Sequence, residues 1–285
     1  MRRLILLIPP LFLVLVPFAV QAGSMSDADY MSAMAAMHAS DSPAPSPAAV
    51  QKPAVPVTGM DVVYATVNGK EVHGYLSRPA GAKGPLPAII VVHEWWGLND
   101  NIRRMTDRLA GEGYAALAVD LYNAPAAKNS DEAKKLMMTL MNDKEAARDN
   151  LKQAYAYLHD HEHAGKMGVI GWCFGGGWAL QAALLFPDKL DALAMYYGQP
   201  VTDVKTLATL KMPLIGFFGE EDTGITVADV LNFQDALKQA GVSAEIHEYP
   251  GAGHAFANPS GEHYVPAAAK DAWERTIRFF KQHLQ

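Results

Sequence analysis

The chain is poor in cysteine and in clustered positive charge. Its 285 residues contain one cysteine, Cys173, which excludes both an internal disulfide and a metal site built from cysteines alone. The formal net charge is −6 and no basic stripe runs along the sequence, so we expect no nucleic-acid partner. Charged residues make up 19% and hydrophobic residues 50%, which provides for a large buried core and excludes a wholly disordered chain.

The first 22 residues have the pattern of a secretory signal peptide. Arg2 and Arg3 precede the apolar run 4–20, and small residues allow cleavage after Ala22. Prolines inside this run make a poor membrane-spanning helix, and no cysteine follows it to carry a lipid. We therefore predict a periplasmic or secreted protein with no stable membrane insertion after cleavage. An uncleaved anchor is the alternative.

Residues 23–57 are rich in proline, alanine and serine, which predicts a flexible linker. Four methionines and His38 in this segment could suggest a soft metal site. No acidic or thiolate ligand set supports that interpretation, and a short, partly ordered helix is the alternative. We expect neither a metal nor an organic cofactor.

From residue 58 to residue 285, strand-like and helix-like segments alternate. A strong hairpin signal, Asn68-Gly69, joins two predicted strands, 62–67 and 71–77. Further strands are predicted over 88–92, 115–119, 167–171, 190–196, 214–218 and 244–249. Helical patterns begin near 99 and cover 130–158, 176–186, 227–240 and 267–283. The alternation predicts a single α/β domain with a mainly parallel sheet covered by helices on both faces.

The sequence Gly171-Trp172-Cys173-Phe174-Gly175 follows an apolar strand and precedes a helix. This is the context of a nucleophile elbow, in which a tight turn exposes the nucleophile at the carboxyl edge of the sheet. The start of the following helix favours both a thiolate and a developing oxyanion. Cys173 is therefore the predicted nucleophile, and a buried structural cysteine is the alternative.

A thiol nucleophile needs a base and a group that orients the base. In α/β-hydrolases the acid and then the histidine follow the nucleophile along the chain, each after a strand. The turn after strand 214–218 carries Asp222, with Glu220 and Glu221 as rival acids, and the loop after strand 244–249 carries His254. We predict His254 as the base and Asp222 as the acid.

A further cluster, His93-Glu94-Trp95-Trp96-Gly97, directly follows strand 88–92. Such folds place the second oxyanion amide at this position, so the backbone N–H groups of Phe174 and Trp95 are the predicted oxyanion hole. Glu94 is expected at the same sheet edge, where its carboxyl could hold the thiol protonated or accept its proton. A surface ion pair is the alternative for Glu94.

Five motifs in order make the chain resemble the dienelactone hydrolase (carboxymethylenebutenolidase) family over about residues 60–285. They are His93-Glu94-Trp95-Trp96-Gly97, Asp120-Leu121-Tyr122, Gly171-Trp172-Cys173-Phe174-Gly175-Gly176, Gly219-Glu220-Glu221-Asp222 and Gly253-His254-Ala255-Phe256. The resemblance implies an α/β-hydrolase fold, a Cys173–His254–Asp222 triad and contact of Glu94 with the resting cysteine. It also implies hydrolysis of a small-molecule lactone or enol ester through an acyl-enzyme. Trp96, Tyr122 and Phe256 are the expected substrate-pocket residues.

The chain departs from this family where the substrate carboxylate is bound. The family carries arginines shortly after the Asp-Leu-Tyr and His-x-Phe motifs, whereas residues 123–125 and 257–259 contain none here. A neutral ester, or a carboxylate placed differently, is as compatible with the sequence as dienelactone. Three other functions stay open: a thioester or amide hydrolase or acyl transferase on the same triad, a thiol-redox protein, and a non-catalytic binding protein. The sequence does not indicate the oligomeric state.

Overall fold

The computed structural model describes residues 27–39, 41–43 and 51–285. The predicted signal peptide lies outside these residues. Among the described residues, no helix combines the length and the apolar character needed to cross a bilayer.

An eight-stranded sheet runs through the described part of the chain, in the order β1-β2-β4-β3-β5-β6-β7-β8. Its strands are β1 (Val57–Val67), β2 (Lys70–Pro79), β3 (Ala88–Val92), β4 (Ala115–Val119), β5 (Met167–Trp172), β6 (Ala192–Tyr196), β7 (Leu214–Gly219) and β8 (Ala244–Tyr249). β2 pairs antiparallel with both β1 and β4, and the strands from β4 through β8 are mutually parallel. The predicted α/β fold with a mainly parallel sheet is therefore confirmed.

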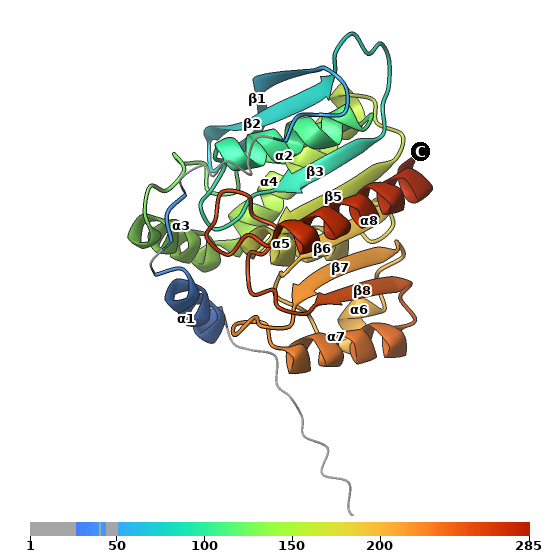
Figure 1. The fold of residues 1–285 in the computed structure, drawn as a ribbon. Coiled ribbons are helices and arrows are strands. Elements are labelled where there is room, and N and C mark those ends of the chain that lie inside the picture. The colour runs from blue at the N-terminus through green and yellow to red at the C-terminus, as the bar shows by residue number, and fades with distance from the viewer. Residues whose placement is uncertain (1–26, 40, 44–50) are drawn as a thin grey trace, which may run out of the picture.

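Helices cover both faces of the sheet. They are α1 (Asp27–Met37), α2 (Asp100–Gly111), α3 (Ser130–Asn142), α4 (Lys144–Ala156), α5 (Phe174–Leu185), α6 (Val204–Leu207), α7 (Val227–Ala240) and α8 (Pro266–Leu284). Figure 1 shows α2 and α8 in front of the sheet and α4 and α5 behind it. α1 lies beside α3, at the edge toward which the parallel strands point. By the geometry of parallel sheets, this edge is the expected place for a ligand site.

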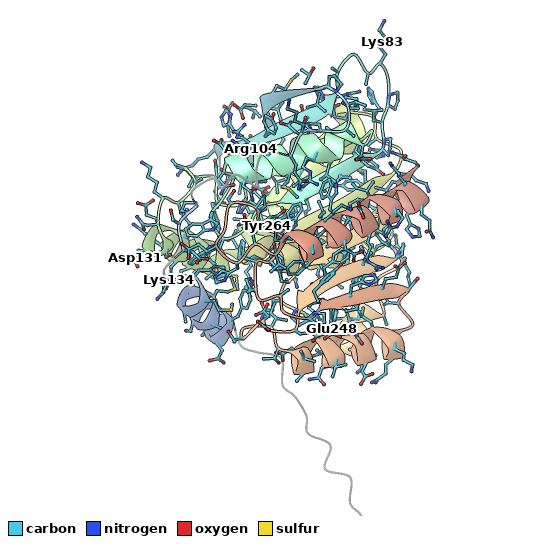
Figure 2. All side chains as sticks on the ribbon, in the orientation of Figure 1. Lys83, Arg104, Asp131, Lys134, Glu248 and Tyr264 are labelled. Atoms are coloured by element: carbon cyan, nitrogen blue, oxygen red, sulfur yellow. The ribbon has the colours of Figure 1, made fainter. Side chains whose placement is uncertain are left out.

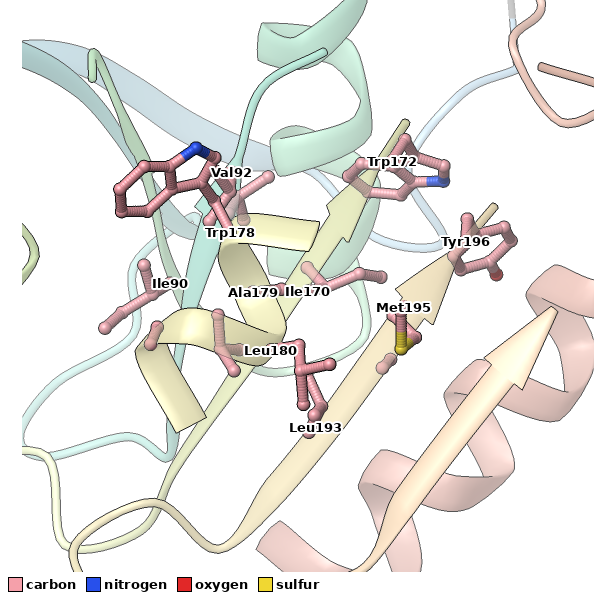
Figure 3. Close-up of a cluster of buried hydrophobic side chains, with 14 of the residues drawn as sticks. Ile90, Val92, Ile170, Trp172, Trp178, Ala179, Leu180, Leu193, Met195 and Tyr196 are labelled. Carbon is pink, nitrogen blue, oxygen red and sulfur yellow. The ribbon is translucent and has the colours of Figure 1, made fainter. Parts of the chain in front are cut away.

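The core lies between the central strands and these helices. Every residue of β3, β4, β5 and β6 is buried, as expected for strands that helices cover on both sides. Figure 3 shows Ala179 and Leu180 of α5 facing Ile90, Ile170 and Leu193 of the sheet. Charged side chains such as Lys83, Asp131 and Lys134 project outward instead (Figure 2). The rigid core thus fixes where the strand ends, and the loops that follow them, lie.

One helix is interrupted where the sequence pattern predicts continuity over 130–158. The chain forms α3 and α4 with a break at Asp143, and a π-turn over Tyr157–His161 follows. Asp143 has φ −134° and its carboxylate accepts a hydrogen bond from the N–H of Ala146 at 3.2 Å. Asp143 therefore caps α4, because an Asp side chain satisfies an otherwise unpaired N–H at a helix start.

The prediction of a flexible linker over 23–57 is wrong for the part that forms α1. Tyr30 and Met34, four residues apart, are buried, and so is His38 at the next such interval. This spacing places all three on one helical face, which packs against the domain. The Ser130 hydroxyl also donates a hydrogen bond to the carbonyl oxygen of His38 at 2.5 Å. Tertiary contacts therefore order this segment despite its linker-like composition.

Candidate active site

Cys173 occupies a strained turn between β5 and α5. Its backbone has φ 56° and ψ −124°, a conformation that non-glycine residues rarely adopt. The flanking glycines are sterically required. A Cβ on Gly171 would lie 2.0 Å from the carbonyl oxygen of Gly175, and one on Gly175 would lie 2.3 Å from that of His93. The turn thus has the form of a nucleophile elbow that holds the thiol above the carboxyl ends of the strands.

His254 and Asp222 meet as predicted from their positions in the sequence. His254 Nδ1 lies 2.7 Å from Asp222 Oδ2. The other oxygen of Asp222 accepts hydrogen bonds from the N–H groups of Gly224 and Ile225, at 2.8 and 2.9 Å. Glu220 and Glu221 are exposed, so the fold selects Asp222 among the three rival acids.

The second ring nitrogen of His254 faces the sulfur. His254 Nε2 and Cys173 Sγ belong to a group of ligand atoms that lie within 4.8 Å of one another. Both side chains are buried, at 6% and 1% exposure. The three residues are therefore arranged in the order acid, imidazole and thiol that a nucleophilic triad requires.

Charges inside this enclosed site shift the pKa values of its members. Burial alone would raise the pKa of Cys173, but the positive charges of His254 and His38 lower it to about 6. Burial would lower the pKa of His254, yet Cys173 and Asp222 together raise it above its ordinary value. The pKa of Asp222 is lowered because the interactions with His254 and with two backbone amides outweigh burial. These directions favour a thiolate beside an imidazolium.

The sequence analysis missed a second histidine at the sulfur. His38, just beyond α1, is 2% exposed, and its ring packs at a tilt of 34° against Trp95 with centroids 4.8 Å apart. Its Nδ1 lies 2.6 Å from Asp41 Oδ2, and its ring centroid lies 5.3 Å from that of His254. Cys173 therefore faces two carboxylate-bound imidazoles.

Glu94 lies at the same sheet edge, as the sequence predicts, but it is not a surface ion pair. It is 3% exposed and accepts a hydrogen bond at 2.8 Å from the amide of Asn258. Asn101 donates in turn to Asn258 Oδ1 at 3.1 Å. Burial, and next the charge of Cys173, raise the pKa of Glu94 to about 8, so its carboxyl is mostly protonated at neutral pH. Asn258 thus stands in one of the regions that lack arginine and holds Glu94 in place.

His93 fixes the loop that carries Glu94 and Trp95. Its Nε2 accepts a hydrogen bond from the N–H of Leu121 at 3.1 Å, so Nδ1 carries the proton and donates to the carbonyl oxygen of Glu94 at 2.6 Å. Burial lowers the pKa of His93 to about 4 and keeps the ring neutral. His93 therefore joins the loops after β3 and β4 without adding charge to the site.

The predicted oxyanion amides come from the ends of neighbouring strands. Phe174 is the first residue of α5, and Trp95 follows β3, which pairs with β5 in the register Val92↔Gly171. The Tyr122 hydroxyl donates to the carbonyl oxygen of Trp95 at 3.1 Å and thereby supports this loop. The role of these amides stays a prediction.

The predicted pocket residues are all at or near the site, but they differ in setting. Trp96 packs on Trp95, with centroids 4.8 Å apart, and Tyr122 packs on Phe174 at 5.6 Å. Phe256 is fully buried against Tyr197 and Tyr249. That these three line the substrate pocket stays a prediction.

A cavity of about 240 Å³ adjoins the elbow. Tyr30 of α1 forms one wall and Phe174 another. Lys144 and Arg148 of α4 also line it, and so does the acidic Asp203. Burial, and next the charge of Cys173, raise the pKa of Tyr30 well above its ordinary value. The N-terminal segment therefore shapes the surroundings of the elbow.

A weak signal for this segment is present in the sequence. The apolar residues Tyr30, Met34 and Met37 recur at helical spacing, and His38 and Asp41 are three residues apart. Nothing local indicates that this face covers the elbow, because the contacts join residues far apart in the chain.

Comparison with known proteins matches this geometry to one family. The sequence pattern of the dienelactone hydrolase family matches residues 72–284. "Protein usf" of Aquifex pyrophilus is 35% identical over 224 residues, which cover 76% of this chain and 96% of that protein. A candidate carboxymethylenebutenolidase of Aquifex aeolicus is 33% identical over 225 residues, covering 76% and 96%. The crystal structure of a candidate dienelactone hydrolase from Klebsiella pneumoniae superposes with a TM-score of 0.72 and 29% identity, covering 80% of this chain and 100% of that one.

Proposed function

Because the chain belongs to the dienelactone hydrolase family and is a carboxylic-ester or lactone hydrolase with an α/β-hydrolase fold, we propose that Cys173 is its nucleophile. In this proposal His254 is the base and Asp222 orients it. The observation that carries the proposal is the buried 2.7 Å pair of His254 and Asp222, set beside a cysteine at a strained elbow.

The reaction proceeds in two halves. The Cys173 thiolate attacks the acyl carbon, and the resulting oxyanion accepts hydrogen bonds from the backbone N–H groups of Phe174 and Trp95. The intermediate collapses to a thioester, and the alcohol leaves with the proton from His254. Water then attacks the thioester while His254 takes its proton, and the acid departs with regeneration of the thiolate–imidazolium pair.

The surroundings of the sulfur favour a neutral ester or lactone at the reacting centre. Asn258 occupies an expected arginine region and is engaged with Glu94, whose carboxyl is mostly protonated at neutral pH. An anionic group farther from the acyl carbon remains compatible, because Lys144 and Arg148 line the adjoining cavity. We also propose, from the signal sequence alone, that the enzyme acts in the periplasm or outside the cell.

The test is hydrolysis of a panel of lactones and aryl esters, in which neutral substrates are paired with carboxylate-bearing counterparts. Cys173→Ala is expected to lower kcat/KM by roughly 10³-fold or more while the thermal unfolding temperature stays near that of the wild type. Intact-mass measurement after rapid quenching should detect the acyl adduct on the wild type alone. Full activity in Cys173→Ala would overturn the assignment of the nucleophile.

The choice of acid is tested separately. Asp222→Asn should lower kcat by about 10⁴-fold, because the amide favours the wrong His254 tautomer. Glu221→Gln is the matched control, since Glu221 is the neighbouring, exposed carboxylate and its loss should change kcat little. Equal losses in the two variants would contradict the role of Asp222.

A further inference from the structure

Two similar histidine–carboxylate pairs converge on one sulfur. His254 Nδ1 is bound by Asp222 at 2.7 Å, and His38 Nδ1 is bound by Asp41 at 2.6 Å. The hydrolysis described above uses only the first pair. His38 and Asp41 therefore form a buried, carboxylate-oriented imidazole at the nucleophile that the hydrolytic mechanism leaves without a function.

The free ring nitrogens of both histidines point into the same space. Within the described residues, neither His38 Nε2 nor His254 Nε2 has a hydrogen-bond partner, although both are buried. These two atoms and Cys173 Sγ all lie within 4.8 Å of one another. Buried polar atoms normally have a hydrogen-bond partner. The two imidazole nitrogens and the sulfur therefore form a set of potential metal ligands.

We propose that His38, Cys173 and His254 together bind one Zn²⁺ ion. A thiolate and two imidazoles are a ligand set that Zn²⁺ prefers, and three protein ligands leave a fourth position for water. Bonds of about 2.0 Å to nitrogen and about 2.3 Å to sulfur would draw the three donor atoms slightly closer together than they lie here. His38 follows a helix outside the central sheet, so a small movement of this segment is enough.

The carboxylates complete the arrangement around the donors. Zinc-binding histidines usually donate their other ring N–H to a carboxylate, which fixes the tautomer and the ring direction. Asp41 and Asp222 already occupy these positions, and His263 Nε2 supports Asp41 at 3.4 Å. The methionine- and histidine-containing segment 23–57 lacks a thiolate of its own, and the fold supplies one from the turn between β5 and α5.

Zinc binding and ester hydrolysis are mutually exclusive in this arrangement. As the Zn–S and Zn–N bonds form, the thiolate binds directly, any proton on an Nε2 atom passes to water, and no atom is oxidised or reduced. A thiolate that is bonded to Zn²⁺ cannot attack an acyl carbon. His254 Nε2, once bonded to Zn²⁺, cannot accept the proton of the attacking water. The metal-bound protein is therefore hydrolytically silent, and removal of the metal restores the nucleophile.

The experiment is a titration of the chelator-treated, reduced full-length protein with Co²⁺, which reports thiolate and tetrahedral coordination by absorbance. We expect one Co²⁺ per chain, a thiolate-to-cobalt charge-transfer band, intense visible ligand-field bands, and their loss when Zn²⁺ is added. His38→Gln, which keeps much of the side-chain volume, should weaken Co²⁺ binding at least tenfold, and Asp41→Asn about tenfold. Cys173→Ser should abolish the charge-transfer band.

The control is His159→Ala, because His159 is an exposed histidine on the π-turn after α4. This variant should bind Co²⁺ like the wild type. Zn²⁺ should also raise the unfolding temperature of the wild type but not that of His38→Gln. Absence of a saturable site, or bands unchanged in His38→Gln, would overturn the proposal. These readouts need no substrate, so they stand or fall separately from the hydrolytic assignment.

Discussion

At the scale of single residues, two buried aspartates respond to burial in opposite directions. Asp222 has its pKa lowered, because the interactions with His254 and two backbone amides outweigh burial. Asp120 accepts three backbone hydrogen bonds from residues 122–124, yet burial dominates and raises its pKa to about 6. An imidazolium partner thus lowers the pKa of a buried aspartate more than three backbone amides do here.

The raised pKa of Asp120 predicts a pH-dependent stability. In the folded state this carboxyl keeps its proton between about pH 4 and pH 6, where the unfolded chain releases it. Its contribution is therefore most favourable below pH 4 and is lost as the pH rises through about 6. As the pH rises from 4 to 7, the wild type should lose about 2 kcal/mol of unfolding free energy that Asp120→Asn does not lose.

Urea unfolding at the two pH values measures this difference. Asp188→Asn, which changes an exposed aspartate in the same way, serves as the control and should follow the wild type. Identical pH dependence of wild type and Asp120→Asn would show that burial does not raise the pKa of Asp120 in the folded state.

At the scale of elements, the two glycine positions that flank the elbow leave no room for a side chain. Gly171→Ala should destabilise the fold by about 3 kcal/mol or more, because its Cβ would lie 2.0 Å from the carbonyl oxygen of Gly175. Gly165→Ala is the matched control, since no atom lies within 4 Å of its Cβ position. It should change the stability by less than about 1 kcal/mol. Thermal unfolding of the two variants measures the difference in stability. Similar losses of stability in both would contradict the steric argument.

α1 packs over the side of the molecule that holds Cys173, so loosening this helix should expose the thiol. Met34 is fully buried, and Met34→Lys should raise the alkylation rate of Cys173 by iodoacetamide about tenfold or more. Met138→Lys introduces the same charge at an exposed methionine of α3 and should leave the rate unchanged. The rate is followed by intact mass, and equal rates in the two variants would contradict a covering role for α1.

The sequence predicted elements best where local pattern and tertiary context agree. Strand 88–92 is a uniform apolar run and strand 244–249 mixes apolar and polar residues, and the structure has the same bounds for both. The break at Asp143 was missed because apolar spacing continues across it, although Asp is a capping residue. The sequence offered α1 only as an alternative, because its order depends on contacts with α3 and on the packing of the following His38 against Trp95.

The candidate site divides in the same way. Cys173, Asp222 and His254 each follow a strand of the parallel sheet, so strand order alone predicts that they meet. His38 and Asp41 follow no strand, and only the packing of a distant helix brings them to the sulfur. Chain order therefore accounts for the meeting of Cys173, Asp222 and His254, and tertiary packing accounts for the meeting of His38 and Asp41 with the sulfur.

At the scale of the whole molecule, the C-terminal helix holds the middle of the sheet. Phe280 of α8 is fully buried against Tyr114 and the glycine at position 168 of β5. Phe280→Ala should lower the free energy of unfolding by about 3–5 kcal/mol in a single cooperative transition. Leu231→Ala, at an exposed leucine of α7, should cost far less. Chemical denaturation followed by circular dichroism and by tryptophan fluorescence tests both; separate transitions would show that α8 unfolds independently.

The enclosure of Cys173 also sets an order of events in folding. Its neighbours at the sulfur come from before the first strand and after the last, and contacts between such distant segments form late. We therefore expect the thiol to be accessible while the sheet assembles and to be covered after β8 has joined its edge. A newly made or refolding chain thus passes through a stage in which its one cysteine is open to oxidants and to other chains. The redox state of the surroundings during that stage governs how much protein reaches the native form with an intact sulfur.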